Sequence, residues 1–292
     1  MKQTLQEEPF FFDNSGGRLF GILHHPNNNT TASIQENGGV NNSQGLVLCS
    51  PFAEEKLWSH RIFVSFARKL ARKGYYAFRF DYMGHGDSEG DFEDSSIETR
   101  LSDIGKAVEI LKDKANVTQV GLLGLRLGAT LTSIFAERDN NIEFLILWEP
   151  IIKVETYLQH CLRSNLATQM AAYKKIIKNR KEITEDLLSG NPANIDGYLV
   201  SSEFYKQASK INLLDNDINF SNPVLIVHIS NKENAPVKKD IQLLHEQKYK
   251  NINKANKLST VIEEPFWTEI KEYYQNAHNL FSGTISWLSD SN

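Results

Sequence analysis

The stretch Gly121-Leu122-Leu123-Gly124-Leu125-Arg126-Leu127-Gly128-Ala129 decides the fold class. Residues 120–124, VGLLG, are typical of a short buried strand, and residues 126–136 have the pattern of a helix. The motif Gly-x-Arg-x-Gly joins the two. Its glycines leave room for a sharp turn, because neither carries a side chain that would collide with the adjoining strand and helix. We therefore predict a strand, a tight turn and a helix, with the side chain of Arg126 projecting from the turn.

The segments on both sides of this turn alternate between short apolar runs and helical patterns. Apolar runs occur at 46–50, 75–80, 144–148 and 224–230, and helical patterns occur at 58–72, 96–112 and 240–247. Such alternation predicts a parallel, doubly wound sheet with right-handed crossovers. At 10–23, FFFDNSGGRLFGIL predicts an antiparallel hairpin ahead of the sheet. Leu258–Glu263 and Glu269–Leu288 are expected to form the last strand and a closing helix.

The regular alternation stops after Trp148-Glu149-Pro150. Residues 151–214 are largely helical by pattern, with no predicted strand, and the sheet pattern resumes only at 224. We predict an α/β core formed by residues 1–150 and 215–292, with a helical cap inserted at 151–214. Pro26–Gly45, rich in Asn, Thr, Ser and Gly, is expected to be a surface loop.

The composition excludes several classes of protein. The chain has 292 residues, 40% of them hydrophobic, and a formal net charge of -4, as in soluble globular proteins. The densest basic group, Lys174–Lys181, is expected to be the exposed face of a helix, and no basic stripe predicts nucleic-acid binding. The spacing of His, Cys, Asp and Glu predicts no metal, and no glycine-rich phosphate loop predicts a cofactor.

The same sequence indicates a cytoplasmic protein. Only Cys49 and Cys161 are present, which is too few for a disulfide framework. The N-terminal residues lack the apolar segment of a signal peptide, and no apolar run approaches the ~20 residues of a transmembrane helix.

A family resemblance rests on the turn at 124–128 together with residues 80–90, FDYMGHGDSEG. Both are similar to motifs of the serine aminopeptidase-like group of α/β hydrolases, in which the turn is the nucleophile elbow. Within that group the chain most resembles hydrolases encoded with exosortase and exopolysaccharide genes. The shared motifs are Pro-Phe-Ala-Glu-Glu (51–55) with a following Arg61, Gly-Leu-Arg-Leu-Gly-Ala (124–129), Trp-x-Pro (148–150) and Gly-Tyr-x-x-Ser (197–201). The resemblance implies the α/β-hydrolase fold but says little about a substrate.

The elbow departs from that of a working hydrolase. A serine nucleophile is deprotonated by a histidine that a carboxylate orients, whereas the guanidinium of Arg126 stays protonated and cannot attack a carbonyl. The acid position, after the strand ending at Ser230, offers only Glu233, and the base position, at 264–267, holds no histidine. His278 is expected on the surface of a helix. We therefore expect that ester hydrolysis has been lost.

Two other residues could be mistaken for a nucleophile. Ser88 lies in Gly86-Asp87-Ser88-Glu89-Gly90, with His85 nearby, but an acidic loop follows it where an elbow requires a helix. Cys49 ends a predicted strand and is interpreted as a small core residue.

Arg126 itself predicts an anion-binding site. It lies at the start of a helix, where free N–H groups and the helix dipole already favour an anion such as a carboxylate, phosphate or sulfate. The alternative is an internal ion pair with Glu149, Glu54 or Glu55. Phe52 is the expected backbone donor nearby, because Pro51 has no N–H. The residues expected to bind a ligand are Phe52, Glu55, Arg61, Leu127, Trp148 and Trp267.

Three functional hypotheses remain open. In the first, a protein without the Ser-His-Asp triad binds a small anionic or saccharide-derived molecule and hydrolyses nothing. In the second, an enzyme has rebuilt its site, with Glu149 or Glu54 as general base and Arg126 as the electrophilic stabiliser of an isomerisation, elimination or acyl transfer. In the third, the cap or the acidic loop at 91–94 docks a protein partner and the pocket is vestigial.

Overall fold

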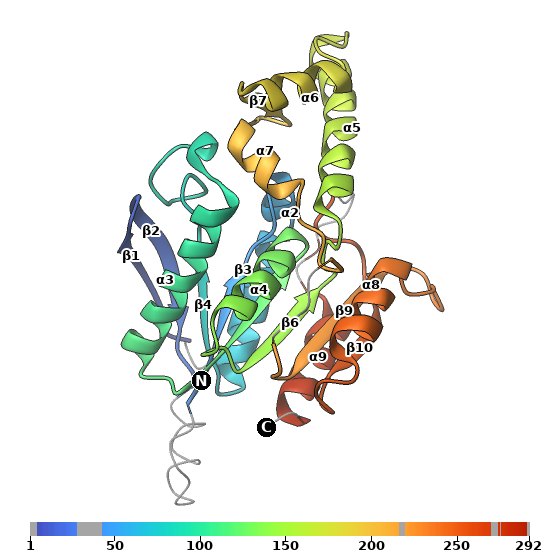
Figure 1. The fold of residues 1–292 in the computed structure, drawn as a ribbon. Coiled ribbons are helices and arrows are strands. Elements are labelled where there is room, and N and C mark those ends of the chain that lie inside the picture. The colour runs from blue at the N-terminus through green and yellow to red at the C-terminus, as the bar shows by residue number, and fades with distance from the viewer. Residues whose placement is uncertain (1–4, 28–42, 216–219, 270–273, 275, 291–292) are drawn as a thin grey trace, which may run out of the picture.

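The computed structural model describes residues 5–27, 43–215, 220–269, 274 and 276–290. Eight strands form one sheet in the order β1-β2-β4-β3-β5-β6-β9-β10 (Figure 1). The strands are β1 (Glu7–Asn14), β2 (Gly17–His24), β3 (Gln44–Cys49), β4 (Tyr76–Phe80), β5 (Gln119–Leu125), β6 (Phe144–Trp148), β9 (Val224–Ser230) and β10 (Lys257–Ile262).

Strand direction in this sheet follows the sequence pattern. The hairpin of β1 and β2 is antiparallel, and β2 joins β4 in antiparallel register. All remaining neighbours, from β4 through β10, are parallel. The predicted fold class, a mostly parallel sheet behind an N-terminal antiparallel hairpin, is confirmed.

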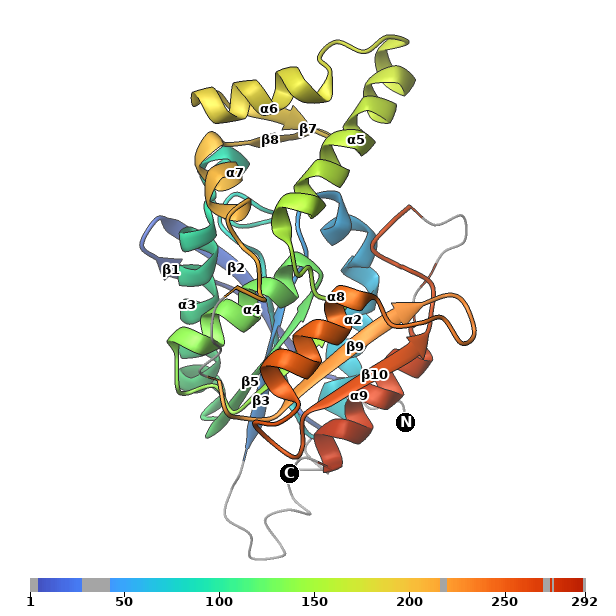
Figure 2. The same cartoon turned by 45° about the vertical axis from the view of Figure 1, so that its right-hand side comes forward.

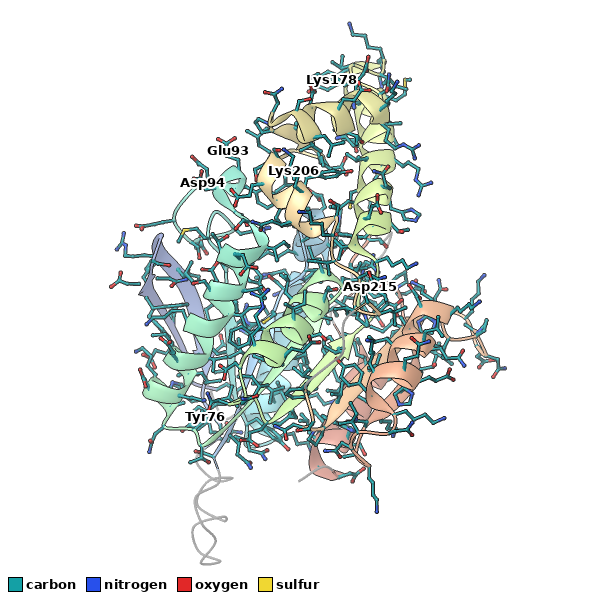
Figure 3. The ribbon with its side chains drawn as sticks, viewed as in Figure 1. Tyr76, Glu93, Asp94, Lys178, Lys206 and Asp215 are labelled. Atoms are coloured by element: carbon teal, nitrogen blue, oxygen red, sulfur yellow. The ribbon has the colours of Figure 1, made fainter. Side chains whose placement is uncertain are left out.

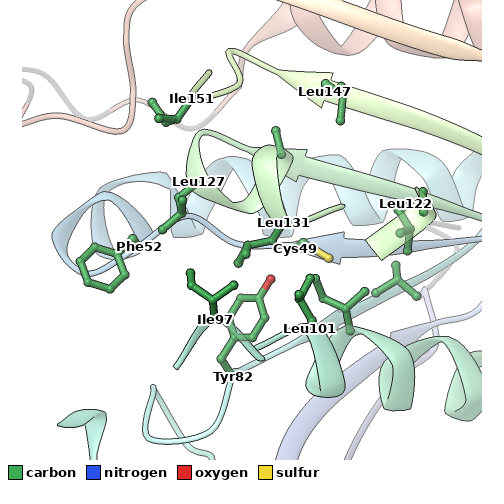
Figure 4. Packing of buried hydrophobic residues seen from close by; sticks show 14 of the residues in the cluster. Cys49, Phe52, Tyr82, Ile97, Leu101, Leu122, Leu127, Leu131, Leu147 and Ile151 are labelled. Carbon is green, nitrogen blue, oxygen red and sulfur yellow. The ribbon is translucent and has the colours of Figure 1, made fainter. Parts of the chain in front are cut away.

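Helices cover both faces of the sheet, as parallel strands require. One face carries α3 (Ile97–Ala115), α4 (Leu127–Arg138) and α8 (Lys239–Leu244), and the other carries α2 (Glu54–Arg72) and α9 (His278–Asp290), as Figures 1 and 2 show. A short 3₁₀ turn, η1 (Phe92–Asp94), precedes α3, and a π-helical turn, η2 (His245–Tyr249), continues α8. Each face has its own apolar core. Figure 4 shows part of the α3 and α4 side, in which Leu101 and Leu122 are buried.

The segment between β6 and β9 rises from the carboxyl edge of the sheet (Figure 2). It contains α5 (Val154–Tyr173), α6 (Arg180–Ser189), β7 (Ala193–Ile195), β8 (Tyr198–Val200) and α7 (Ser202–Ala208). Its two ends lie side by side, because Val154 N donates to Ile211 O at 3.0 Å and Leu213 N donates to Ile152 O at 3.0 Å. We therefore propose residues 151–214 as a cap and residues 1–150 and 215–292 as the core.

Three local expectations are corrected by the structure, and a fourth lies largely outside the part that it describes. The cap includes a small antiparallel hairpin, β7 with β8, that the pattern did not predict. Lys174 ends α5 in a left-handed conformation, so Lys174–Lys178 form a loop and not a helix face. The closing helix begins at His278, and Glu269 is not helical. Most of the expected loop Pro26–Gly45, from 28 to 42, lies outside the described residues.

Among the helices that the structure describes, none is both long and apolar enough to cross a membrane.

Candidate functional site

The turn between β5 and α4 has the geometry that its glycines predict. Arg126 adopts φ 56° and ψ -122°, a strained conformation for a residue with a side chain. A Cβ on Gly124 would collide with the backbone of Gly128 and Ala129, and a Cβ on Gly128 would collide with the carbonyl groups of Cys49 and Ser50. The two glycines therefore let α4 begin directly against β3 and β5, with Arg126 at the bend.

The guanidinium of Arg126 is bound to one carboxylate oxygen. Nε and Nη2 both donate to Oε1 of Glu55, at 3.1 and 3.0 Å. Glu55 lies in the first turn of α2, which follows β3. The alternative in which Arg126 forms an internal ion pair is thus realised on one edge of its fork, with Glu55 as the partner and not Glu149 or Glu54. Within the described chain, Nη1 makes no hydrogen bond.

Two aromatic rings flank the same guanidinium. The Cζ atom of Arg126 lies 5.2 Å from the ring centroid of Trp267 and 5.5 Å from that of Tyr157. Both distances are within the range of a cation–π contact. Trp267 follows β10, where a hydrolase places its catalytic histidine, and Tyr157 comes from α5 of the cap. The two rings therefore hold the cation in place, and neither supplies the imidazole that a hydrolase needs there.

A cavity of about 870 Å³ lies between the carboxyl edge of the sheet and the cap. The core contributes one wall, and one face of α5 contributes a second wall. The core wall includes Arg126, Glu55, Trp58, Lys238 and Trp267. The wall on α5 consists of Thr156, Tyr157, His160, Cys161, Ser164 and Thr168. Ligands in open α/β sheets bind at this edge, and the lining combines cations, hydroxyl groups and aromatic rings.

The two neighbouring glutamates of α2 differ in environment. Burial raises the pKa of Glu55, and Arg126 opposes this shift. Oε2 of Glu55 is buried without a hydrogen-bond partner, although the residue lines the cavity. Burial, and then the nearby Asp196 of the cap, raise the pKa of Glu54. Glu55 is thus the carboxyl group that pairs with Arg126, and Glu54 faces the cap.

Glu149 has a different role from the one predicted. It is fully buried, and its Oε2 accepts from Nδ1 of His228 at 2.9 Å and from the N–H of Ile229 at 2.7 Å. Its Oε1 lies 2.6 Å from Nζ of Lys238. Burial acts to raise the pKa of Glu149, but the hydrogen bond with His228 and the charge of Lys238 outweigh it and lower that pKa. Glu149 therefore joins β6 to β9, and of the described side chains that line the cavity only Lys238 belongs to this cluster.

The other residues expected to bind a ligand are divided between cavity and core. Phe52 and Trp267 line the cavity. Leu127, the first residue of α4, is buried in the apolar cluster that Figure 4 shows around Phe52 and Leu131. Its N–H has no acceptor within the helix, because the first helical hydrogen bond is the one from Ala129 N to Arg126 O.

Trp148 and Arg61 are not part of the cavity wall, contrary to expectation. Trp148 is 0% exposed and its Nε1 donates to the hydroxyl of Thr284 at 3.1 Å, because the last residue of a central strand can point into the core between sheet and helix. Arg61 lies on the exposed face of α2.

The residues that resemble alternative catalytic groups have structural surroundings. Ser88 donates its hydroxyl hydrogen to Asp81 O at 2.6 Å and accepts from Phe20 N at 2.9 Å, so it joins a turn to the strands. Burial raises the pKa of the Cys49 thiol to about 12, which leaves it protonated. Glu233 and His278 are both exposed.

Sequence reasoning missed the wall that the cap provides. Tyr157, His160, Ser164 and Thr168 recur at helical spacing, so a projection of α5 onto a helical wheel would have placed them on one face. Lys238 gave no such signal, because it follows β9 in a loop of unpredictable path. Burial raises the pKa of the Cys161 thiol to about 12, and this thiol lines the same wall.

The profile of the family described as serine aminopeptidase, S33, matches residues 57–228. This match spans more than half of the chain. The chain belongs to this family of α/β hydrolases. The S33 resemblance stated from the motifs is thereby confirmed, while a link to exosortase or exopolysaccharide genes stays a proposal. No curated protein sequence matches the chain.

Solved structures of other α/β hydrolases share the fold of this S33 member. Est1E from Butyrivibrio proteoclasticus, solved with ferulic acid bound, is 20% identical, with a TM-score of 0.62 over 96% of this chain and 97% of that one. The Pyrococcus furiosus esterase Pf2001 is 14% identical, with a TM-score of 0.63 over 98% and 91%. Mouse alpha/beta hydrolase domain-containing protein 10 is 15% identical, with a TM-score of 0.57 over 98% and 100%. At these identities the likeness shows the fold alone.

Proposed function

We propose that the protein binds a small anionic or saccharide-derived molecule in the cavity above Arg126 and does not hydrolyse esters. The observation that carries this proposal is that Glu55 binds only some of the donors of the Arg126 guanidinium. Glu55 occupies the edge formed by Nε and Nη2, while Nη1 makes no hydrogen bond to a described residue. A guanidinium held in this way can still bind an oxyanion through its remaining donors.

The surroundings of Arg126 support an anion. The N-terminus of α4 carries partial positive charge and free N–H groups, including that of Leu127. Lys153 and Lys238 also line the cavity. The ligand would meet the acidic side chains of Glu54 and Asp196 on the cap side, so one anionic group attached to a polar, hydroxyl-bearing body fits the distribution of charge.

The walls support a saccharide-derived body. Trp58, Trp267 and Tyr157 present aromatic faces, on which sugar rings can pack. Thr156, Ser164 and Thr168 add hydroxyl groups along α5. The motif resemblance to hydrolases encoded with exopolysaccharide genes agrees with such a ligand. On the basis of the cysteine usage, we propose the cytoplasm as the compartment.

Loss of hydrolysis is supported by all three triad positions. Arg126 occupies the elbow, Trp267 lies against it where a histidine is needed, and the exposed Glu233 follows β9. A histidine–carboxylate pair does exist in Glu149 and His228, but both side chains are buried.

Thermal shift assays test the anion site. Sugar phosphates, uronic acids, simple carboxylates and nucleotide sugars should be compared for wild type and Arg126→Ala, with the exposed Arg72→Ala as a matched loss of charge. We expect at least one anionic class to raise Tm for wild type and Arg72→Ala but not for Arg126→Ala. If no compound raises Tm, or if Arg126→Ala responds like wild type, the proposal is wrong.

A rebuilt enzyme is the second candidate, and one observation favours it. Glu55 has a raised pKa and a buried oxygen, Oε2, without a hydrogen-bond partner beside the cavity. These properties suit a general base better than those of Glu149, which is bound to Lys238 and His228. Every compound that raises Tm should therefore be incubated with the protein in D₂O and examined by mass spectrometry. Deuterium incorporation by wild type and Glu54→Gln, but not by Glu55→Gln, would support this enzyme, whereas no exchange with wild type would contradict it.

A further inference from the structure

Five large apolar side chains are exposed on the helices and loop at the end of the cap farthest from the sheet, which Figures 1 and 2 locate. Tyr173 is 63% exposed, Leu188 55% and Ile177 53%, and Met170 and Ile176 are each 47% exposed. They come from the last turn of α5, the loop after it, and α6. We call these five residues, with the basic residues between Tyr173 and Lys181, the cap tip.

All charged residues from Tyr173 to Lys181 are basic. The sequence YKKIIKNRK contains Lys174, Lys175, Lys178, Arg180 and Lys181 and no acidic residue. Figure 3 shows Lys178 at the outer end of the cap. Lys178 pairs with Asp186 at 2.5 Å and Lys181 with Glu185 at 3.6 Å. Within the described chain, Lys174, Lys175 and Arg180 form no ion pair. Residues 173–181 are therefore positive in a protein whose net charge is -4, although Glu182, Glu185 and Asp186 follow on α6.

The loop that presents the two isoleucines has a defined conformation. The buried side chain of Gln169 accepts from the N–H groups of Ile177 and Lys178, at 2.7 and 3.0 Å, and donates to Asn165 at 2.7 Å. Asn179 caps α6 through the N–H groups of Lys181 and Glu182. Hydrogen bonds from the inside of the cap thus fix a loop whose apolar side chains point to solvent.

We propose that the cap tip docks on the surface of an anionic lipid bilayer. Exposed Ile, Met, Leu and Tyr side chains can enter the interface between head groups and acyl chains, while neighbouring lysines extend to lipid phosphates. A protein partner fits less well, because the centres of protein interfaces are depleted in lysine. A second copy of this chain fits less well too, since two positive tips repel each other.

The cap tip lies beyond the end of the cavity wall on α5. The docking proposal goes beyond the proposed function and does not depend on it. The cavity wall on α5 runs from Thr156 to Thr168, about 18 Å along the helix axis, and Met170 and Tyr173 follow on the next turn. Docking through the tip would therefore bring the far end of this wall to the membrane surface while the sheet remains in water.

Flotation with lipid vesicles tests the proposal on the full chain. Vesicles of phosphatidylcholine alone should be compared with vesicles that also contain phosphatidylglycerol, at low and high salt. We expect binding to the anionic vesicles only, with a weaker response at high salt because exposed charges are screened. The double variants Ile176→Glu/Ile177→Glu and Lys174→Glu/Lys175→Glu should each lower the partition coefficient by about tenfold or more.

The matched control is Ile252→Glu/Lys254→Glu, which changes an exposed isoleucine and an exposed lysine near β10, away from the cap. It should bind vesicles like wild type, and circular dichroism should show that all variants keep the fold. Absence of binding to anionic vesicles, or equal binding by the tip variants, overturns the proposal. A concentration-dependent dimer that the tip variants abolish would instead assign the surface to a second copy.

Discussion

Nε and Nη2 of Arg126 converge on a single oxygen of Glu55, at 3.1 and 3.0 Å. The contact joins the bend after β5 to the first turn of α2, which follows the neighbouring strand β3. Because both side chains are largely shielded, at 14% and 16% exposure, each charge depends on the other for compensation. The same contact orients the guanidinium and leaves Nη1 of Arg126 as the donor that can meet a ligand, while Oε2 of Glu55 stays buried.

Replacing one partner of this ion pair should lower the free energy of unfolding more than replacing both partners. Arg126→Met leaves a buried carboxylate without its cation, and we expect the free energy of unfolding to fall by about 2 kcal/mol or more at pH 8. Arg126→Met/Glu55→Gln should recover part of that loss. At pH 5 the penalty of the single variant should shrink, because burial raises the pKa of Glu55 and the orphaned group takes up a proton. Urea denaturation at both pH values measures this.

The exposed pair Arg138–Glu98 provides the control for that cycle. Its side chains are 54% and 61% exposed, so its coupling energy should be about 1 kcal/mol or less. Coupling between Arg126 and Glu55 no larger than in this pair would contradict the interpretation.

Restoring the hydroxyl at the elbow should not restore hydrolysis. Trp267, Tyr157 and the carboxylate of Glu55 surround residue 126, and none of them is a histidine that could take the proton of a serine hydroxyl and return it to the leaving group. We expect no burst with nitrophenyl acetate and no labelling by a fluorophosphonate in either wild type or Arg126→Ser. Labelling at Ser88 in wild type would show that the turn at 86–90 supplies a nucleophile after all.

The fold could be predicted from the sequence because each level of pattern agreed with the next. Buried parallel strands such as FLILW at 144–148 read as continuous apolar runs, and the glycines at 124 and 128 have a steric cause that a single chain reveals. The position of Arg126 followed directly.

The partner of Arg126 could not be predicted in the same way. Glu54 and Glu55 are consecutive on one helix, so their side chains point about 100° apart, and only the packing of α2 selects one of them. Glu149 follows the neighbouring strand β6, but a positive φ of 45° accompanies its turn toward β9, where it meets His228. The burial of Trp148 could not be predicted either, because Trp148 packs against α9. The sequence pattern placed the start of that helix too early.

Glu137 in α4 should make the protein less stable as the pH rises. Burial raises the pKa of Glu137 from its ordinary value of 4.5 to about 7. The folded state therefore holds this proton more tightly than the unfolded state, and stability falls between pH 4.5 and about 7. Glu137→Gln should gain about 1 kcal/mol relative to wild type at pH 8 and little at pH 4.5. Urea midpoints measure the difference, with the exposed Glu109→Gln as background; a gain of equal size at both pH values would refute the prediction.

A pair of glycine substitutions tests the steric basis of the elbow. A Cβ on Gly128 would meet the carbonyl oxygens of Cys49 and Ser50, which are main-chain atoms at the end of β3 and cannot rotate away. Gly128→Ala should therefore lower the free energy of unfolding by roughly 1–3 kcal/mol or more. Gly283 also lies within a helix, α9, but nothing lies within 4 Å of its added Cβ. Gly283→Ala should instead stabilise the protein by about 0.5–1 kcal/mol, through helix propensity. Chemical denaturation of both variants measures the contrast. Equal effects would mean that α4 can move away from β3, and that the elbow does not hold Arg126 at a fixed position above the sheet.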